Sequence, residues 1–416
     1  MNIKKLLSDS LYTFISTAFS RLVFIALSII SADLLIRDNF QSFSVLISTV
    51  NMIIASVGFA LGSTVLKKAV KYQCGDDDEN EKNNFMSLVT YISFLLVLLL
   101  VLSLIALPKI SNWIFLGNEL VTLFMILSAV IGVASTVASY LIVSLEMFKT
   151  LSKIRFVSSL CLILSTLIIY YVDNEETQFY LLMFFYLGHF ITLLFWFVFS
   201  YYSNGWKLNL IKLTFKHNNG MLKLAFPAFL SNFTYAAVMW LQMIVIYKVS
   251  GERELASKVA VALTWYNAIV FLPQILSSVI LPKLLKARDT DFKLHMYRGV
   301  VINTISVTIA VIGVFVLSTA IDGLYSKQFE SISTLVLIMA LSAYPNAWCK
   351  LTGQYFLVKD KMLLGFIFNL GWGIVYTAVT YFLIPIYNEY AVGIGLIVSY
   401  FFLLFSQMIY FKRVSS

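Results

Sequence analysis

The sequence contains few charged residues. Asp, Glu, Lys and Arg make up only 12% of its 416 residues, whereas 60% are hydrophobic. Soluble domains average about 25% charged and 45 to 50% apolar residues. Apolar runs of about 20 residues recur along the chain, and this length is enough for a helix to cross a hydrocarbon core. The composition therefore excludes a soluble globular protein and predicts a polytopic membrane protein.

The sequence also has little that would support catalysis or metal binding. Its three cysteines are scattered, without a CxxC pair, at Cys74, Cys161 and Cys349, a spacing that predicts neither a metal site nor a cofactor. No GxxxxGK[ST] motif is present, which excludes P-loop ATP binding. The loops are short and carry no cluster of acids and histidines, so we expect no catalytic residues and a protein that is not an enzyme.

Twelve apolar segments are predicted to cross the membrane. They are predicted to be helices because a helix satisfies every backbone hydrogen bond within one lipid-exposed segment. The segments are residues 11–35, 41–66, 85–107, 119–145, 155–172, 180–202, 225–247, 259–281, 298–320, 333–357, 362–385 and 389–411. The expected fold is all-α, with a six-helix lobe at 1–202, a cytoplasmic loop at 203–224 and a second six-helix lobe at 225–416.

The positive charges follow the predicted topology. The two termini and the even-numbered loops hold about 22 of the 30 Lys and Arg residues, and the odd-numbered loops hold about six. Cytoplasmic loops are enriched in Lys and Arg, so both termini are predicted to be cytoplasmic. Because these cations do not form one basic stripe, we expect no nucleic-acid partner despite the net charge of +9.

An internal repeat supports the division into two halves. A shift of 215 residues places GSTVLKKAVK, at 62–71, on SSVILPKLLK, at 277–286, with a serine, a leucine and two lysines coinciding. The alternative is that both segments are basic loop ends that obey the same topology rule. An even number of spans between the repeats gives the two halves the same orientation, an arrangement that predicts a central cavity in a transporter.

Two cations are predicted to lie inside membrane spans. A charge at membrane depth is costly and usually faces a cavity or a partner. Arg21 lies in the first span, with Thr17 one turn away on the same face. Lys350 lies in the tenth span, in an i, i+4 series with Asn346 and Gln354. Further polar candidates for the cavity are Asn232, Gln242, Asn267 and Gln274.

Both cations have a structural alternative. Arg21 could pair with Asp33 or with a backbone carbonyl, although Asp33 is about three turns away, and Lys350 could extend to the cytoplasmic surface. If both instead face a cavity, they predict an anionic substrate such as a diphosphate, because a cation attracts phosphate more strongly where water is sparse. His189 is interpreted as an interior histidine rather than a proton relay, and Gly58 with Gly62 as a GxxxG helix-packing motif.

The sequence resembles a known transporter family at several places. The segment 225–286 (AFPAFLSNFTYAAVMWLQ to FLPQILSSVILPKLLK) is similar to the seventh and eighth helices of the Wzx-type O-antigen flippases of the multidrug/oligosaccharidyl-lipid/polysaccharide exporter superfamily. GFALGSTVLKKAVKY, which ends the second span, is also similar, and the twelve-span layout covers essentially the whole chain. The sequence departs from the family at Gln242, where many relatives have an aspartate.

The resemblance implies a V-shaped, MATE-like fold of two lobes in the bacterial inner membrane. It also implies translocation of an undecaprenyl-diphosphate-linked oligosaccharide, an O-antigen or similar surface polysaccharide repeat unit, from the cytoplasmic to the periplasmic leaflet. Membrane lipid, a polysaccharide polymerase and assembly proteins are the implied partners. Two alternatives stay open: a multidrug or cation antiporter of the same superfamily, which would need membrane-embedded carboxylates, and a membrane polymerase or transferase.

Overall fold

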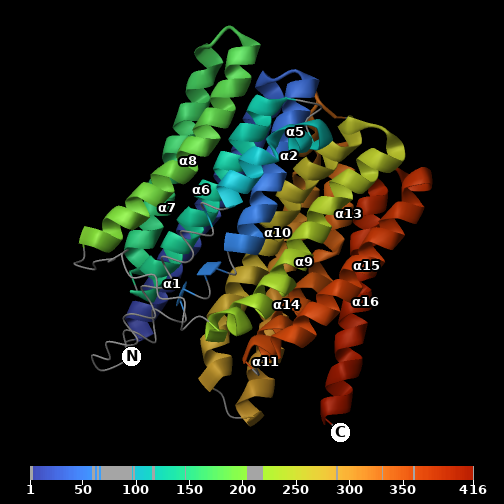
Figure 1. The fold of residues 1–416 in the computed structure, drawn as a ribbon. Helices are drawn as coiled ribbons and strands as arrows, with labels where there is room; N and C mark the ends of the chain where they lie inside the picture. Colours follow the sequence, from blue (N-terminus) through green and yellow to red (C-terminus); the bar gives the residue numbers. More distant parts are fainter. Residues whose placement is uncertain are drawn as a thin grey trace. The chain divides into compact units, whose positions relative to one another are not determined.

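The computed structural model describes residues 3–58, 61–62, 65–66, 96, 99–114, 118–145, 147–203, 219–286, 289–329, 331–358 and 361–415. Every regular element in this part of the chain is helical (Figure 1). In chain order these elements are α1 (Ile3–Leu34), α2 (Arg37–Ile53), the π-helix η1 (Ile54–Gly58), α5 (Leu107–Ile114), α6 (Glu119–Ser144), α7 (Phe148–Ile168), the 3-10 helix η2 (Ile169–Tyr171), α8 (Glu175–Ser203), α9 (Asn219–Ser250), α10 (Arg253–Lys286), α11 (Asp289–Val316), α12 (Ser318–Leu324), α13 (Ile332–Leu341), α14 (Ala343–Val358), α15 (Met362–Tyr387) and α16 (Tyr390–Ser415).

The chain is a multi-pass membrane protein. Within the described residues, nine helical segments are long and apolar enough to cross a bilayer, and the bent pair α13–α14 makes a tenth. These segments coincide with ten of the twelve predicted spans. Of the other two predicted spans, 85–107 contains residues outside the described part, and 259–281 lies within α10, which is not among these ten segments. The count of twelve stays a prediction.

The tenth span is broken, contrary to the continuous helix expected from its side-chain pattern. The bend between α13 and α14 is 42°, and Ser342 lies at the break as the C-cap of α13. Pro345 lies in the first turn of α14, where its missing N–H leaves no helical hydrogen bond unmade. The polar series of this span therefore continues through Asn346 and Lys350 in α14, while Ser342 belongs to the hinge.

The described chain forms two compact units. Unit 1 comprises Met1–Val23 and Leu46–Ala236, and unit 2 comprises Phe24–Val45 and Ala237–Ser416. The contacts thus group the end of α1 and the start of α2 with the C-terminal helices, although these residues precede most of unit 1 in the sequence. The predicted boundaries at 202 and 225 stay a prediction.

Close packing in unit 1 depends on the two glycines of the GxxxG motif. A Cβ added to Gly58 would lie 3.2 Å from the Thr136 side chain, and one added to Gly62 would lie 2.1 Å from the Tyr140 ring. Thr136 and Tyr140 are one turn apart on α6, so the glycines let α6 approach the second span. The packing role predicted for this motif is confirmed.

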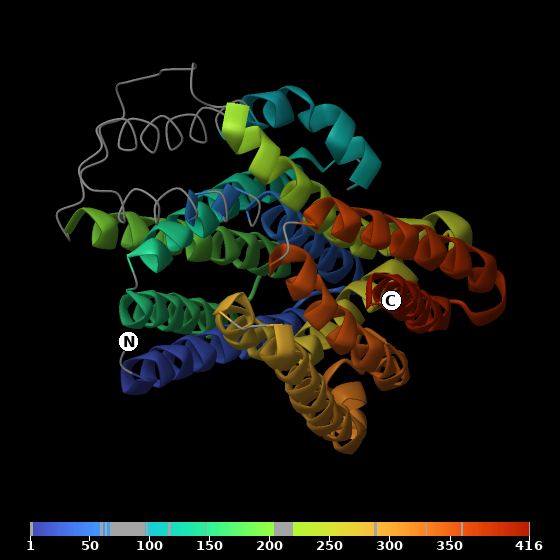
Figure 2. The same cartoon turned by 90° about the horizontal axis from the view of Figure 1, so that it is seen from below.

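Unit 2 contains the antiparallel hairpin of α15 and α16. The two helices lie side by side in Figure 1 and again in Figure 2, where they are near the C-terminus. Trp372, Tyr376 and Tyr400 are buried between them, with ring centroids 5.3 to 5.5 Å apart. Gly395 permits this contact, since a Cβ there would lie 2.5 Å from the Thr380 Oγ1.

Gly395→Ala is expected to destabilise the protein, by about 1 to 2 kcal/mol, because the added methyl group overpacks the α15–α16 contact. Gly371→Ala is the matched control: its Cβ would have its nearest neighbour, Phe402, at 3.5 Å, and alanine is the better helix former by about 1 kcal/mol. Thermal unfolding of both variants in detergent should give shifts of opposite sign. Equal shifts would show that the contact does not limit stability.

Candidate functional site

Arg21 lies on α1 at membrane depth. It follows the start of the apolar segment Tyr12–Leu34 by nine residues, about 13 Å along the helix axis. Its side chain is exposed. Thr17, one turn earlier, donates its hydroxyl proton to the Thr13 carbonyl (2.7 Å). A charged side chain at this depth is costly against lipid and indicates a polar surface or a ligand.

The ion pair of Arg21 with Asp33, one of the structural alternatives for this arginine, is not observed. The Asp33 Oδ1 instead accepts from the Lys327 Nζ at 2.5 Å. Among the described residues Arg21 makes no ion pair. The lumen role of Arg21 stays a prediction.

Helix α7 runs alongside α1 in unit 1. The Phe19 and Phe156 rings stack with their centroids 4.3 Å apart, and the Lys149 Nζ lies 5.4 Å from the centre of the Tyr12 ring. Both contacts have the same offset of 137 residues and are separated by seven residues, or two turns, on each helix. The two helices are therefore parallel and keep this register over at least two turns.

This register brings a second arginine to the level of Arg21. Arg155 of α7 is half-buried, and its position along the axis corresponds to Ala18 of α1, about 4.5 Å from the level of Arg21. The two arginines therefore lie within about one helical turn of each other along the axis. Neither arginine forms an ion pair with another described residue.

Arg155 is the first residue of the predicted span 155–172 and was counted with the basic residues of the preceding loop. Helix α7 begins at Phe148, so Arg155 is two turns inside the helix. Its depth was missed because Lys149, Lys153 and Arg155 together resemble the basic end of a cytoplasmic loop.

His189 is an interior histidine, as interpreted from the sequence. It is 5% exposed, and its Nδ1 lies 2.9 Å from the Ser158 Oγ, which in turn lies 2.9 Å from the Thr192 Oγ1. The three side chains link α7 to α8. This network explains how unit 1 accommodates a polar ring at membrane depth, since its hydrogen bonds offset the cost of burial.

In unit 2 the polar series of α14 is largely engaged inside the helix bundle. Asn346 is 1% exposed and donates from its Nδ2 to the Tyr266 Oη at 2.8 Å. Trp348 donates to the Thr304 Oγ1 at 2.9 Å. Lys350, one turn after Asn346, is half-buried. Asn346 thus joins α14 to α10, and Lys350 keeps partial access to solvent.

Gln242 is fully buried, which differs from the cavity-lining position predicted for it. Its Nε2 donates to the Val238 carbonyl (3.1 Å) and to the Thr377 Oγ1 (3.2 Å). Its Oε1 is buried and has no hydrogen-bond partner in the described part of the chain. Gln242 therefore links α9 to α15 through a neutral amide where an aspartate would place a charge.

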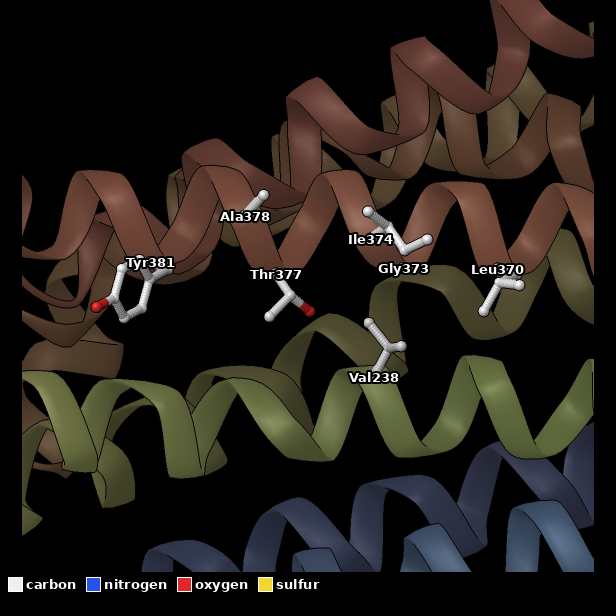
Figure 3. Close-up of a pocket in the computed structure, with 7 residues that line it drawn as sticks. All are labelled: Val238, Leu370, Gly373, Ile374, Thr377, Ala378 and Tyr381. Atoms are coloured by element: carbon white, nitrogen blue, oxygen red, sulfur yellow. The ribbon is translucent and has the colours of Figure 1, made fainter.

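A groove of about 470 Å³ lies over this same contact (Figure 3). Val238 of α9 faces Gly373 and Thr377 of α15 across it, and the remaining lining residues are Leu370, Ile374, Ala378 and Tyr381. The mostly apolar lining suits hydrocarbon and not a sugar. The groove is therefore not the polar path expected for a hydrophilic substrate.

The remaining predicted site residues lie on helices of the same two units. Asn267 is on α10 and exposed. Asn232 on α9, Gln274 on α10 and Gln354 on α14 have side chains outside the described part of the structure.

The end of α1 is held within unit 2 by polar contacts. Gln328 is buried and donates from its Nε2 to the carbonyls of Ala32 and Leu35, both at 2.9 Å, so it caps the helix. Tyr325 donates its hydroxyl proton to the Ser28 Oγ at 3.1 Å, and burial raises the pKa of this hydroxyl to about 12. The hydroxyl therefore stays neutral and available as a donor at physiological pH.

Solved structures share this fold at low sequence identity. A multidrug resistance MATE family transporter of the MOP superfamily, in its inward-facing conformation, matches with a TM-score of 0.77 and 12% identity over 95% of this chain and 94% of that chain. The lipid II flippase MurJ, in its inward closed conformation, matches with a TM-score of 0.72 and 16% identity over 96% and 87% of the two chains.

An outward-facing MATE family transporter also matches, with a TM-score of 0.68 and 13% identity over 99% of this chain and 96% of that chain. No protein-family model matches the sequence, and no curated protein matches it. The chain therefore has the polytopic α-helical fold of MATE transporters and MurJ, and the likeness at these identities establishes the fold alone.

Proposed function

We propose that this protein is a transporter of the MOP superfamily that moves a lipid-linked oligosaccharide diphosphate from the cytoplasmic to the periplasmic leaflet of the bacterial inner membrane. The observation that supports this most strongly is Arg21, which lies nine residues inside an apolar span and has no ion-pair partner among the described residues. An anionic head group is the natural ligand of such a cation. The O-antigen repeat unit is the substrate that the sequence resemblance favours.

The distribution of carboxylates supports an anionic substrate over a cationic drug. Within the described spans, Asp and Glu side chains occur only near helix ends, as at Asp33 and Glu119. A proton-coupled cation antiporter needs a carboxylate at depth to bind its substrate and proton. The lipid II flippase among the structural neighbours shows that this fold accommodates a lipid-linked substrate in another protein.

Arg21 and Lys350 have distinct tasks in this transport. Arg21 in unit 1 attracts the diphosphate, and Lys350 in unit 2 provides a second positive charge along the substrate path. The lipid tail stays in hydrocarbon while polar side chains of several helices give the sugars a hydrated path. Both termini are cytoplasmic, and a polysaccharide polymerase is the expected downstream partner.

Leaflet-resolved transport in proteoliposomes tests this function. A prenyl-diphosphate-linked oligosaccharide with a fluorescent sugar is placed in one leaflet, and its arrival in the other is followed by a membrane-impermeant quencher. We expect the protein to accelerate translocation over protein-free vesicles. A cationic dye serves as the comparison substrate. Dye movement without oligosaccharide movement, under any imposed ion gradient, would replace the flippase with the antiporter.

A further inference from the structure

The apolar groove between α9 and α15 offers a ligand no charged group. None of its seven lining residues carries a charge, and its volume is about 470 Å³. Ligand pockets in proteins typically have volumes of about 300 to 1,000 Å³. Val238 of α9 points toward α15, and Leu370 and Thr377 of α15 point toward α9 (Figure 3). Both helices therefore contribute to the groove, which lies within unit 2.

The groove lies entirely at membrane depth. Helix α15 supplies the apolar span Leu363–Tyr387. Of the residues of α15 that line the groove, Leu370 is seven residues from the start of this span and Tyr381 is six residues from its end. Each end of the groove is therefore about 9 Å or more inside the span, at 1.5 Å per residue. A ligand in the groove would be surrounded by hydrocarbon and not by water.

The groove is continuous with a lipid-facing stripe of α15. Leu363, Ile367, Leu370 and Ile374 follow one another at spacings of four, three and four residues, which places them on one helical face. All four side chains are exposed, by 42% to 62%. An exposed apolar face within a membrane span contacts the hydrocarbon of the bilayer. The groove therefore opens on a surface that lipid chains already cover.

The contact beneath the groove joins α9 and α15 through small or neutral groups. A Cβ added to Gly373 would lie 2.7 Å from the Val238 Cγ2, so the glycine permits the close approach. One turn later the Thr377 hydroxyl accepts from the Gln242 Nε2 at 3.2 Å. Both pairs have an offset of 135 residues, so the two helices run parallel here. The Thr377 hydroxyl is engaged by the buried Gln242, and the groove keeps its apolar character.

We propose that this groove binds one acyl chain of a bilayer phospholipid. Along α15 the groove extends over eleven residues, from Leu370 to Tyr381, which is about 16 Å. One leaflet contributes half of a hydrocarbon core of about 30 Å, so an acyl chain of one leaflet matches the length of the groove. An undecaprenyl tail is much longer than the groove. The inference goes beyond the proposed function and does not depend on which substrate is transported.

A bound acyl chain is expected to stabilise unit 2. The chain would contact both α9 and α15 beside the thin contact at Gly373, and a ligand that binds only the folded protein raises its stability by mass action. Because no residue that lines the groove is charged, the head group is not selected. Phosphatidylethanolamine and phosphatidylglycerol with the same acyl chains should therefore bind equally well.

Native mass spectrometry of the purified full chain tests the site. The protein is delipidated in detergent, and palmitoyl-oleoyl phosphatidylethanolamine is added back. We expect one phospholipid to stay bound to the unaltered protein. Leu370→Trp places a larger side chain in the groove and should lower phospholipid affinity about tenfold. The added phospholipid should also raise the unfolding temperature of the unaltered protein but not that of Leu370→Trp.

Leu363→Trp is the matched control. Leu363 is an exposed leucine on the same face of α15, two turns before Leu370, and does not line the groove. This variant should bind phospholipid as the unaltered protein does. Equal binding by the two tryptophan variants, or no phospholipid on the unaltered protein, would overturn the site.

A competing lipid distinguishes a bilayer lipid from the tail of a substrate. Geranylgeranyl diphosphate at the same concentration should not displace the phospholipid from the unaltered protein. Displacement would overturn the bilayer lipid as the occupant and assign the groove to a prenyl chain. Should Leu370→Trp fail to fold, Ala378→Phe fills the same groove from another exposed position on α15, and phospholipid affinity unchanged by it would overturn the site as well.

Discussion

Arg21→Ala is expected to lower the initial rate of oligosaccharide translocation by about 30-fold or more. The substitution removes charged hydrogen bonds to the head group, each of which contributes about 1.5 to 3 kcal/mol, and 2 kcal/mol corresponds to about 30-fold in affinity. Arg21→Lys should retain an intermediate rate, because an ammonium keeps the charge but loses the bidentate geometry. The measurement is the leaflet-resolved rate at equal amounts of folded protein.

Leu22→Ala is the control for Arg21→Ala. Leu22 neighbours Arg21 on α1 and is 63% exposed, so its truncation should change neither the fold nor the rate appreciably. A rate for Arg21→Ala equal to that of Leu22→Ala would remove Arg21 from the substrate path. It would also remove the observation on which the proposed function depends most.

Breaking the buried ion pair of Lys258 and Glu389 is expected to lower the free energy of unfolding more than the other substitutions do. The Lys258 Nζ lies 2.8 Å from the Glu389 Oε1, and the two side chains are only 8% and 10% exposed. Glu389→Gln leaves the ammonium buried without its counter-charge, which typically costs about 3 to 5 kcal/mol. The pair joins α10 to the turn between α15 and α16, so unit 2 should lose stability as a whole.

A double-mutant cycle checks this effect. Combining Glu389→Gln with Lys258→Met removes both charges, and the double variant should be more stable than Glu389→Gln alone. Lys327→Ala is the comparison, because its ion pair with Asp33 is exposed, with side chains 66% and 43% accessible, and such pairs contribute about 1 kcal/mol or less. If Glu389→Gln and Lys327→Ala lowered the thermal unfolding temperature equally, the buried pair would not stabilise the protein more than the exposed pair does.

Much of the fold follows from local properties of the sequence. Long apolar runs specify helices that cross a membrane whatever their neighbours are, since lipid leaves no alternative for the backbone. The GxxxG motif likewise predicted close packing, and the glycines at 58 and 62 do lie against α6. The charge bias of the loops predicts the topology, which the proposed transport direction requires.

The candidate site was predictable only in part, because the surroundings of its residues depend on how the helices pack together. The cation at Arg21 was found from its depth in an apolar run. The depth of Arg155 was missed because α7 begins at Phe148, seven residues before the predicted span. Gln242 was expected in a cavity, but its amide bonds Thr377, which lies 135 residues further along the chain. A one-dimensional pattern carries no information about such a partner.

Composition and residue spacing alone predicted an all-helical, multi-pass membrane protein with a cation inside its first span. Those features depend on composition and on spacing within single helices. The break of the tenth span at Ser342, the pairing of Asp33 with Lys327 and the bond between Gln242 and Thr377 became visible with the folded chain. Each of these depends on which helices pack together, and side chains far apart in the chain set that packing through shape and charge.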